Sequence, residues 1–438
     1  MTLPARGARP LGRAGSFVAG ADDLEAIYYN PAGLAGTGGV SAMIGGGLVF
    51  QGVRYERVDS GGVPLAPVEN QNHLIPIPFL GVSWRPEGLS RRVTFALGAF
   101  APYMGVPEYP ENGPQRYSLV SIAGTAIAVA ELAVAIRLTP LTSPSGFYLG
   151  AGFQNMFFSL NNRTTLSGCT ELNCPPEDPN FDSPTQVKVS SPFTPSGNVG
   201  LLYVHPMFRL GASVQLPFWV RASGTVKSRL PKDPQFDGAE VVGDKIDVDL
   251  NLPAVARVGA EVRPVRGLRI EVGVDYEAWQ MQDKIRFVPR EVYIDNIHGI
   301  GRYDLRPMEI DRSMQGVWGV HIGGEYDALR WLTVRAGYLY ETSGVPKETL
   351  SVLTPDGAKH LLALGLSARV WKLRVDVGYG HFFQPDRTVQ WCATPDQPGC
   401  SRSYQLNPIQ PSPFKIPVGS GTYQVRTDVL SVALEGRF

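Results

Sequence analysis

From about residue 40 to the C-terminus, apolar and polar residues alternate with a period of two. In the segment Leu268 to Trp279 the even positions are apolar or aromatic, and the odd positions include Arg269, Glu271 and Asp275. This alternation is typical of a β-strand with one face in a polar environment and the other in an apolar one. No long segment after residue 40 shows the 3.6-residue period of a helix. We therefore predict an all-β fold.

The alternating segments number about fourteen, and the last of them ends at Phe438. An even number of antiparallel strands is the rule for single-chain bacterial outer-membrane barrels, and a terminal aromatic residue is a common ending of them. The same last strand could also be the edge of a soluble sandwich. The predicted strands cover residues 40–58, 76–86, 92–102, 117–138, 146–160, 192–204, 207–227, 245–263, 268–282, 315–326, 331–342, 358–371, 372–384 and 421–438.

The connections between these segments alternate between short and long. The short ones lie near residues 86–91, 139–145, 205–206, 264–267, 327–330 and 371, and the long ones span 59–75, 103–116, 161–191, 228–244, 283–314, 343–357 and 385–420. Short periplasmic turns and long outer loops are the signature of an outer-membrane barrel, whereas a soluble sandwich has no reason to sort its loops this way. We predict a 14-stranded antiparallel transmembrane β-barrel.

Composition agrees with a membrane role that depends on strands. Formal net charge is zero, so no basic surface indicates nucleic acid, and charged residues make up 18% of the chain, below the roughly 25% of soluble domains. No apolar run approaches the 18 or so residues of a transmembrane helix.

The N-terminus and the cysteines bear on the compartment. The start, Met1 to Arg6, lacks the apolar core of a signal peptide, which indicates either a cytoplasmic protein or a mature chain whose signal is absent. The cysteines favour the mature chain, because two local pairs in loop-like sequence are typical of disulfides formed outside the cytoplasm. A four-cysteine zinc site is the alternative, with less usual spacing. The pairs are Cys169 with Cys174 and Cys392 with Cys400.

Residues 1–40 differ from the rest. They are rich in Gly and Ala, and a short helix is predicted from Asp22-Asp23 to Tyr29, where Asn30-Pro31 ends it. This segment could be a disordered tail, or it could fold back into the lumen, which fourteen strands leave wide enough to need filling.

Three motifs carry a family resemblance. Leu11 to Ser16, followed by Ala21-Asp-Asp and by Asn30-Pro-Ala-Gly-Leu34, resembles the N-terminal hatch of the FadL/TodX outer-membrane transporters of long-chain fatty acids and hydrocarbons. The stretches 335–365 and 252–259 resemble later parts of the same family, in the same order. The resemblance implies a hatch at residues 1–40 that plugs a barrel at residues 41–438. Within the hatch, Asn30, Pro31 and Ala32 would act as a gate or as a rigid plug.

The resemblance also implies a route for a hydrophobic ligand. The ligand would be caught outside, move to a pocket above the hatch, and leave sideways through a kink in the third strand. Gly98 and Pro102 are the candidate positions for that kink, since both residue types weaken a ladder, although Pro102 could simply end the strand. On the following loop, the apolar residues Tyr103, Met104 and Val106 would capture ligand or pack within the loops.

Fatty-acid members of the family hold the carboxylate with basic side chains inside the barrel. The fifth strand here presents Phe157 and Phe158 in its middle and has no basic residue until Arg163. Arg312 is the other candidate, and both arginines could instead be solvated residues of the rim. This departure favours an uncharged hydrocarbon or another lipid.

Catalytic motifs are missing from the sequence, which contains no His-Glu-x-x-His, no Gly-x-Ser-x-Gly and no phosphate loop. We therefore predict a passive outer-membrane channel for hydrophobic compounds, without metal or cofactor, that works as a monomer among outer-membrane lipid and lipopolysaccharide. The alternatives are a structural or adhesive barrel that binds partners through its long loops, and an outer-membrane enzyme.

Overall fold

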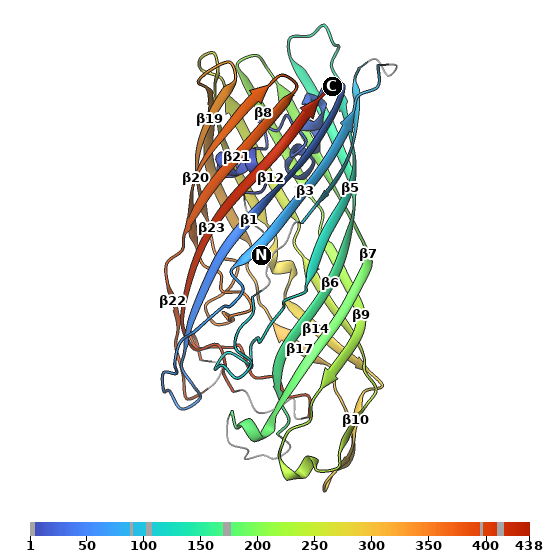
Figure 1. Cartoon of the computed structure of the whole chain (residues 1–438), viewed down its shortest axis with the longest axis vertical. Coiled ribbons are helices and arrows are strands. Elements are labelled where there is room, and N and C mark those ends of the chain that lie inside the picture. The colour runs from blue at the N-terminus through green and yellow to red at the C-terminus, as the bar shows by residue number, and fades with distance from the viewer. Residues whose placement is uncertain (1–4, 88–90, 102–106, 170–176, 395–396, 410–415) are drawn as a thin grey trace.

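A computed structural model describes residues 5–87, 91–101, 107–169, 177–394, 397–409 and 416–438. Its main feature is a tilted ring of antiparallel strands, drawn from the side in Figure 1. In order around the ring these are β1 (Val40–Arg57), β3 (Leu74–Trp84), β4 (Val93–Phe100), β5 (Ala126–Arg137), β6 (Gly146–Ser167), β7 (Asp182–Val204), β8 (Phe208–Gln215), β12 (Val255–Val262), β13 (Leu268–Glu277), β18 (Val317–Asp327), β19 (Leu332–Glu341), β20 (Lys359–Val370), β21 (Leu373–Phe383) and β23 (Gly421–Arg437).

The ring closes between the first and last strands. β23 pairs with β1 over its whole length, from Ser41 opposite Arg437 to Arg57 opposite Gly421. Walking the pairings from β1 through β8, β12 and β23 back to β1 passes through the fourteen strands named above. The predicted 14-stranded antiparallel barrel is therefore confirmed, with one ring strand in each predicted segment.

The two ends of the barrel differ as the loop lengths predict. The short connections share one end, at the top of Figure 1, which we call the turn end; the long connections share the other, which we call the loop end. At the loop end the wall continues in β9 (Phe218–Ser228), β11 (Lys245–Leu252), β14 (Lys284–Arg290) and β17 (Met308–Asp311). The smaller elements there are β2 (Val68–Glu69), β22 (Arg387–Val389), the three-stranded sheet of β10 (Glu240–Val242), β15 (Tyr293–Ile297) and β16 (Gly301–Asp304), and the 3-10 turns η3 (Pro179–Phe181), η4 (Pro234–Phe236) and η5 (Trp279–Met281).

Among the described residues, α-helix occurs only near the N-terminus, in α1 (Ala8–Gly12) and α2 (Ala26–Tyr29). The 3-10 helix η1 (Pro31–Gly36) follows α2. None of the helices in the described ranges has the length and apolar character needed to cross a membrane.

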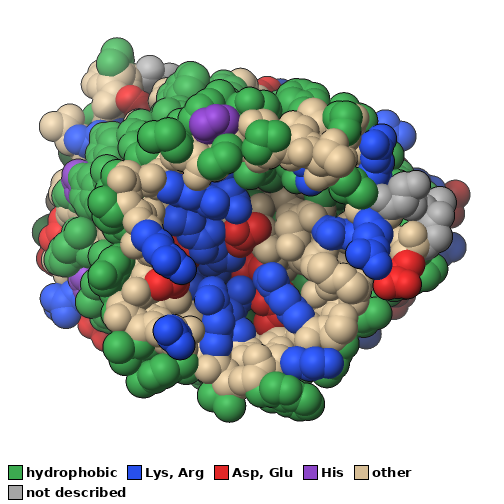
Figure 2. Space-filling model, turned by 90° about the horizontal axis from the view of Figure 1, so that it is seen from above, with side chains coloured by type: hydrophobic (Ala, Val, Ile, Leu, Met, Phe, Trp, Pro, Cys, Tyr) green, Lys and Arg blue, Asp and Glu red, His purple; other side chains and the backbone are tan. Residues whose placement is uncertain are grey.

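Side chains of the ring strands alternate between the outside and the lumen. Outside, Val258 and Leu364 are 60% and 64% exposed, whereas Glu261 and Glu271 on the lumen face are fully buried. Seen from the turn end, hydrophobic side chains cover the outer wall, and Lys, Arg, Asp and Glu gather in a central hollow (Figure 2). The apolar faces of the predicted strands therefore point outward in this part of the barrel.

In two places the apolar face changes from the outside to the lumen between two consecutive strands. In β8 the even position Val214 points outward, but after Pro217 the even positions Phe218 and Val220 of β9 point into the lumen. The same reversal occurs between β11 and β12, around Pro253. Proline cannot donate a hydrogen bond to the ladder, so the strand is interrupted there. A shift of one residue across the interruption moves the even positions from the outer face to the lumen face. Because of the two breaks, the apolar residues near the loop end line the lumen.

Candidate functional site

The N-terminal residues 5–37, which we call the lumen segment, lie inside the ring at the turn end (Figure 1). α1 packs against β19, β20, β21, β23 and β1, whereas η1 packs against β4, β5, β6 and β7. The wall makes room for this backbone with inward glycines: a Cβ at Gly337 or Gly323 would lie 2.4 or 2.2 Å from atoms of Arg13. A Cβ at Gly150 would lie 2.1 Å from the amide nitrogen of Ala32. Such approaches are possible only for glycine, so the wall is shaped around the segment.

Buried ion pairs join the lumen segment to the wall. Removing one partner of a buried pair leaves an uncompensated charge and costs about 3–5 kcal/mol. The pairs between segment and wall are Arg9 with Glu325 (3.0 Å), Arg13 with Glu271 (2.9 Å) and Glu261 (3.2 Å), Arg374 with Asp23 (2.7 Å), and Asp22 with Arg209 (2.9 Å) and Arg269 (2.8 Å).

Glu271 on β13 makes the densest of these contacts. Its carboxylate accepts hydrogen bonds from the backbone N–H groups of Val18 (2.7 Å), Ala19 (2.9 Å) and Gly20 (2.8 Å), in addition to Arg13. Three oriented N–H groups and one guanidinium satisfy a carboxylate fully. Glu271 is therefore the principal anchor of the lumen segment.

The predicted hatch residues lie on the opposite part of the wall. Asn30 is fully buried, and its Nδ2 donates to the carbonyls of Val18 (2.9 Å) and of Leu201 on β7 (3.0 Å). Pro31 and Ala32 pack against glycines of β6 and β7. The three residues thus form a close-packed anchor. Their gating role and the division into hatch and barrel stay predictions.

A cavity of about 500 Å³ lies in the lumen, between the lumen segment and the loops. A volume of this size is usual for small-molecule sites. Its lining is mostly apolar, with Thr125, Asn162, Gln282, Arg312 and Thr354 as the polar side chains. The apolar lining includes Ile75, Ile122, Ile127, Phe158, Leu160, Leu250, Leu252, Trp279, Ile285, Phe287, Ile310, Met314 and Leu353.

This lumen cavity reaches the outer surface of the barrel. Among its lining residues are Pro76 and Pro78 of β3 and Ala126 and Ala128 of β5, and all four are exposed on the outer face. β4 lies between these strands, and its last pairs with β3 and β5 among the described residues are those of Phe100. The described lining of the cavity therefore reaches through the wall between β3 and β5, next to those last pairs.

The predicted kink residues lie beside this passage. Gly98 is within the regularly paired part of β4, opposite Gly81 and Glu131, and a Cβ there would meet Ile27 at 2.8 Å. Close packing against the lumen segment explains the glycine, and the ladder ends two residues later. Pro102 and the predicted capture residues Tyr103, Met104 and Val106 lie outside the described residues.

The two phenylalanines predicted as ligand contacts point in opposite directions. Phe158 is 5% exposed and lines the cavity, whereas Phe157 is 49% exposed on the outer face. Neighbouring residues of a strand face opposite sides of a sheet. Of the two, only Phe158 contributes to the lumen cavity.

The two predicted basic residues also differ. Arg163 is half-buried and forms ion pairs with Glu108 (2.7 Å) and Glu111 (3.1 Å), as a residue of the rim would. Arg312 is 3% exposed, so the prediction of a solvated arginine is wrong for it. It is the only charged residue among the described residues that line the cavity.

Arg312 lies where two cavities meet. It lines the lumen cavity and also a second cavity of about 140 Å³ at the loop end, to which Arg402, Glu309 and Asp311 contribute. Its Nη2 donates to Thr354 Oγ1 (2.5 Å), its Nε has no partner, and no ion pair to it is found in the described part of the chain. Burial lowers the pKa of Arg312 to about 10, so it is charged at neutral pH.

A chain of buried amides that ends at Glu131 on β5 has no signal in the sequence pattern. Gln215 donates to Gln154 Oε1 (2.6 Å), and Gln154 donates to Glu131 Oε2 (2.6 Å). The remaining atoms, Glu131 Oε1 and Asn198 Oδ1, both lack a donor and both crowd the same side of Gly152. Asn198 Nδ2 is fixed by the carbonyl of Ile27 (2.9 Å). A proton on Glu131 would satisfy both acceptors.

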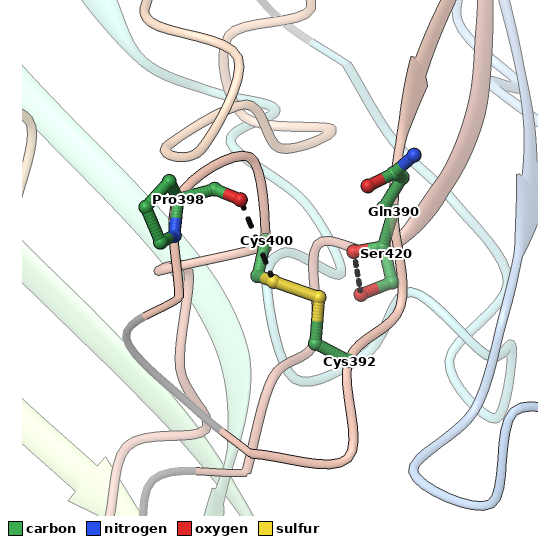
Figure 3. Close-up of a disulfide and its surroundings, with 5 residues drawn as sticks. All are labelled: Gln390, Cys392, Pro398, Cys400 and Ser420. Atoms are coloured by element: carbon green, nitrogen blue, oxygen red, sulfur yellow. Dashed lines mark hydrogen bonds between the residues drawn. A yellow bond between two sulfur atoms is a disulfide. The ribbon is translucent and has the colours of Figure 1, made fainter.

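One predicted disulfide joins Cys392 and Cys400, in the loop before β23 (Figure 3). Beside it, Ser420 donates to the carbonyl of Gln390 (3.3 Å), which ties this loop to the start of β23. Cys169 is disulfide-bonded as well, and its predicted partner Cys174 lies outside the described residues.

Comparison with known families agrees with the closed barrel and its lumen cavity. The model of the family described as outer membrane protein transport protein (OMPP1/FadL/TodX) matches residues 1–403. The chain belongs to this family. Membership makes it an outer-membrane protein of a transporter family, which confirms the resemblance carried by the N-terminal motif.

Solved structures show the same fold. A Pseudomonas aeruginosa FadL homologue has 16% sequence identity and a TM-score of 0.75, over 100% of this chain and 99% of that one. The Ralstonia pickettii toluene transporter TbuX has 17% identity and a TM-score of 0.67, with coverage of 100% and 99%. The P. putida toluene transporter TodX has 14% identity and a TM-score of 0.66, also with 100% and 99%. A comparison with curated protein sequences finds no match.

Proposed function

We propose that this protein is a passive channel that carries hydrophobic compounds with an acidic head group, such as fatty acids, from the loop end into the outer membrane. The compound binds in the lumen cavity and leaves sideways between β3 and β5. The supporting observation is an apolar cavity that reaches the outer wall and has Arg312 as its one charged lining residue among those described.

A sideways exit suits an apolar cargo. Burial of apolar surface stabilises by about 25 cal/mol per Å², and this stabilisation would be lost on a path through the charged turn end. The passage beside Pro76 and Ala128 avoids that path, because it opens on the lipid-facing side of the wall. The lumen segment, seated by Glu271 and the other ion pairs, would act as the plug that closes the direct route.

Arg312 selects the head group. Its guanidinium is buried, charged and without an ion-pair partner among the described residues, so an anionic ligand would supply the missing partner. A hydrogen bond to a charged group contributes about 1.5–3 kcal/mol. We accordingly assign the acidic group of the ligand to Arg312 and its apolar chain to the cavity around Phe158 and Trp279.

Native mass spectrometry of the detergent-purified protein with oleate, decane and toluene tests this assignment. The variant Arg312→Met keeps an unbranched, flexible side chain and removes the charge, so oleate should bind about ten- to hundredfold more weakly, while decane should bind as before. Arg163→Met is the matched control, because Arg163 is paired at the rim. Its oleate affinity should equal that of the wild type.

Two results would count against the proposal. Equal oleate affinity in Arg312→Met and the wild type would show that the binding site does not recognise an acidic head group through Arg312. If no ligand binds, and deletion of the gene leaves uptake of hydrophobic substrates unchanged, the transport function itself is wrong. We propose a monomer surrounded by lipid and lipopolysaccharide, with no catalytic step in transport.

A further inference from the structure

The β3 edge beside the passage carries two prolines, Pro76 and Pro78, separated by one residue. Proline has no backbone N–H, so its effect on a ladder depends on which neighbouring strand that N–H would face. On the far side β3 pairs regularly with β1, from Val40 opposite Trp84 to Phe50 opposite Leu74. The hydrogen bonds between β1 and the residues that flank β3 therefore show which neighbouring strand each backbone N–H of β3 faces.

Those hydrogen bonds fix the alternation. Just outside the two ends of β3, Gln51 N–H donates to the carbonyl of His73 (2.8 Å), and Arg85 N–H donates to the carbonyl of Gly39 (2.8 Å). In an antiparallel ladder, the N–H and C=O of one residue face the same neighbour, and the next residue faces the other. The odd-numbered residues of β3 therefore bond to β1, and the even-numbered residues face β4. Pro76 and Pro78 are both even.

Among the described residues, the last pair of the ladder between β3 and β4 is Phe79 with Phe100. Continuing the register would set Pro78 opposite Ala101, which is described and does not pair with it. Pro78 has no N–H to give to the carbonyl of Ala101. That carbonyl instead accepts a hydrogen bond from Nη1 of Arg6, at the start of the lumen segment (3.2 Å). Arg6 thus satisfies the acceptor that the proline leaves without a strand partner.

Resting on the proposed sideways exit, we propose that Pro76 and Pro78 are the positioning residues that hold the exit open by preventing the ladder from extending past Phe79. An ordinary residue at either position would present an N–H to the passage. Such a donor in an apolar environment is costly unless it is paired, and pairing it would draw the chain beyond Phe100 onto β3. The prolines remove both donors, so the edge stays unpaired without leaving N–H groups unsatisfied.

The double variant Pro76→Ala/Pro78→Ala tests this role, with two readouts on protein that migrates as folded barrel in unheated gels. Hydrogen–deuterium exchange of the peptide covering residues 74–82 reports whether the two new amides are protected. Uptake of radiolabelled oleate by cells, together with oleate binding to the purified protein, separates exit from binding. We expect protected amides and uptake reduced at least fivefold, by a factor larger than any loss of oleate affinity that follows from changing two residues of the cavity lining. Each single variant should give a smaller loss, and serves if the double variant does not fold.

Pro289→Ala is the matched control. Pro289 lies in β14 at the loop end, opposite Ile246, so the substitution adds an N–H to a strand away from the passage. Its uptake should equal that of the wild type.

The other outcomes separate this inference from the function on which it rests. Unprotected amides with normal uptake would overturn the role of the prolines and leave the sideways exit standing. Protected amides with normal uptake would overturn the sideways exit and the inference with it. A loss of oleate affinity as large as the loss of uptake would show that the prolines shape the binding cavity rather than the exit, which also overturns the inference.

Discussion

The two halves of the lumen are built in opposite ways. Near the turn end the inward positions of β12 include Arg257, Gly259 and Glu261, and ion pairs there hold the lumen segment in place. Near the loop end the inward positions of the preceding β11 include Leu250 and Leu252, which line the lumen cavity. Ion pairs and hydrogen bonds demand one partner in one geometry, whereas apolar contacts are non-directional.

In the proposed channel, this difference would let one barrel both close the direct route and bind cargo. The polar half holds the lumen segment, which is part of the same chain, in directional contacts. The apolar half would accept a ligand that enters and leaves, which non-directional contacts allow. Variants in the two halves test the contrast, first in the polar half and then in the apolar half.

The largest effect is expected from Glu271→Ala. The substitution leaves the three backbone N–H groups of residues 18–20 without an acceptor and removes one ion-pair partner of Arg13. Loss of one member of a buried pair costs about 3–5 kcal/mol, enough to unseat the lumen segment. Conductance in planar bilayers should rise well above that of the wild type. The control Glu87→Ala removes an exposed ion pair with Arg91 and should leave the conductance unchanged. Equal conductance in the two variants would contradict the role of Glu271 as the anchor of the lumen segment.

A steric change in the polar half should act in the same direction without altering charge. A Cβ at Gly337 would lie 2.4 Å from the carbonyl carbon of Arg13, so Gly337→Ala should displace the segment and cost about 1–3 kcal/mol. Thermal unfolding and bilayer conductance measure the effect. Gly52→Ala is the control, since a Cβ there meets nothing within 4 Å. Similar stabilities for the two variants would contradict the close fit.

The charge of Arg312, which lies where the two cavities meet, should make oleate binding depend on pH. Burial lowers the pKa of Arg312 to about 10. An anionic ligand binds the charged form, so the contribution of Arg312 is fully present below that pH and is lost as pH rises through it. Oleate affinity should be constant from pH 7 to 9 and fall by about tenfold at pH 11, where about a tenth of the arginine remains charged. Arg312→Met should show no such fall; an equal fall in that variant would assign it to another group.

A deletion in the apolar half should have a modest effect that does not depend on the head group. Leu250→Ala removes about 40 Å² of apolar contact, or about 1 kcal/mol, which corresponds to about fivefold weaker binding of both oleate and decane. Isothermal titration measures both affinities. A loss confined to oleate would indicate that Leu250 acts on the head group rather than on the chain.

The smallest effect is expected at Glu131. In Glu131→Gln the new amide can donate to Asn198 Oδ1 while its oxygen still accepts from Gln154. The change in stability should therefore be below about 0.5 kcal/mol, whereas Glu131→Ala should cost about 1–3 kcal/mol by leaving Gln154 and Asn198 unpaired. Thermal unfolding compares the two variants, and a strongly destabilised Gln variant would show that the carboxylate itself is required.

Local alternation was sufficient to predict the barrel. Each strand is a period-two segment, and the sorted loop lengths follow from strands that all cross in the same way. The motif around Asn30 was recognisable because the tight packing of its residues restricts their identity. Alternation also explains why Phe157 and Phe158 point apart, although it does not say which of the two enters the lumen. The register shift between Met156 and Phe158 adds its extra residue on β7, so the alternation along β6 continues through it, and only ring closure shows that the even positions are the inner ones.

The site was harder to predict, because its residues are distant in sequence. Arg163 and Arg312 are equivalent in sequence terms, yet Arg163 forms ion pairs with acidic side chains of a neighbouring loop, and Arg312 lies among cavity residues that are far apart in the sequence. Two prolines spaced by one residue within a strand pattern were a signal for the edge at Pro76 and Pro78. The effect of these prolines on the ladder depends on which neighbouring strand each of them faces, and the sequence does not show this.

The sequence by itself determined the strand number, the two kinds of connection and the family, because these depend on local periodicity and on short motifs. It did not determine which face of a strand is the inner one. Most apolar residues of 246–262 and of 208–222 are at even positions, with Val255 and Trp219 as exceptions. These even positions face the lumen on the loop side of Pro253 and Pro217, and they face outward on the turn side. Only closure of the ring around the lumen segment decided this, because the inside of a strand is defined by what the other strands enclose.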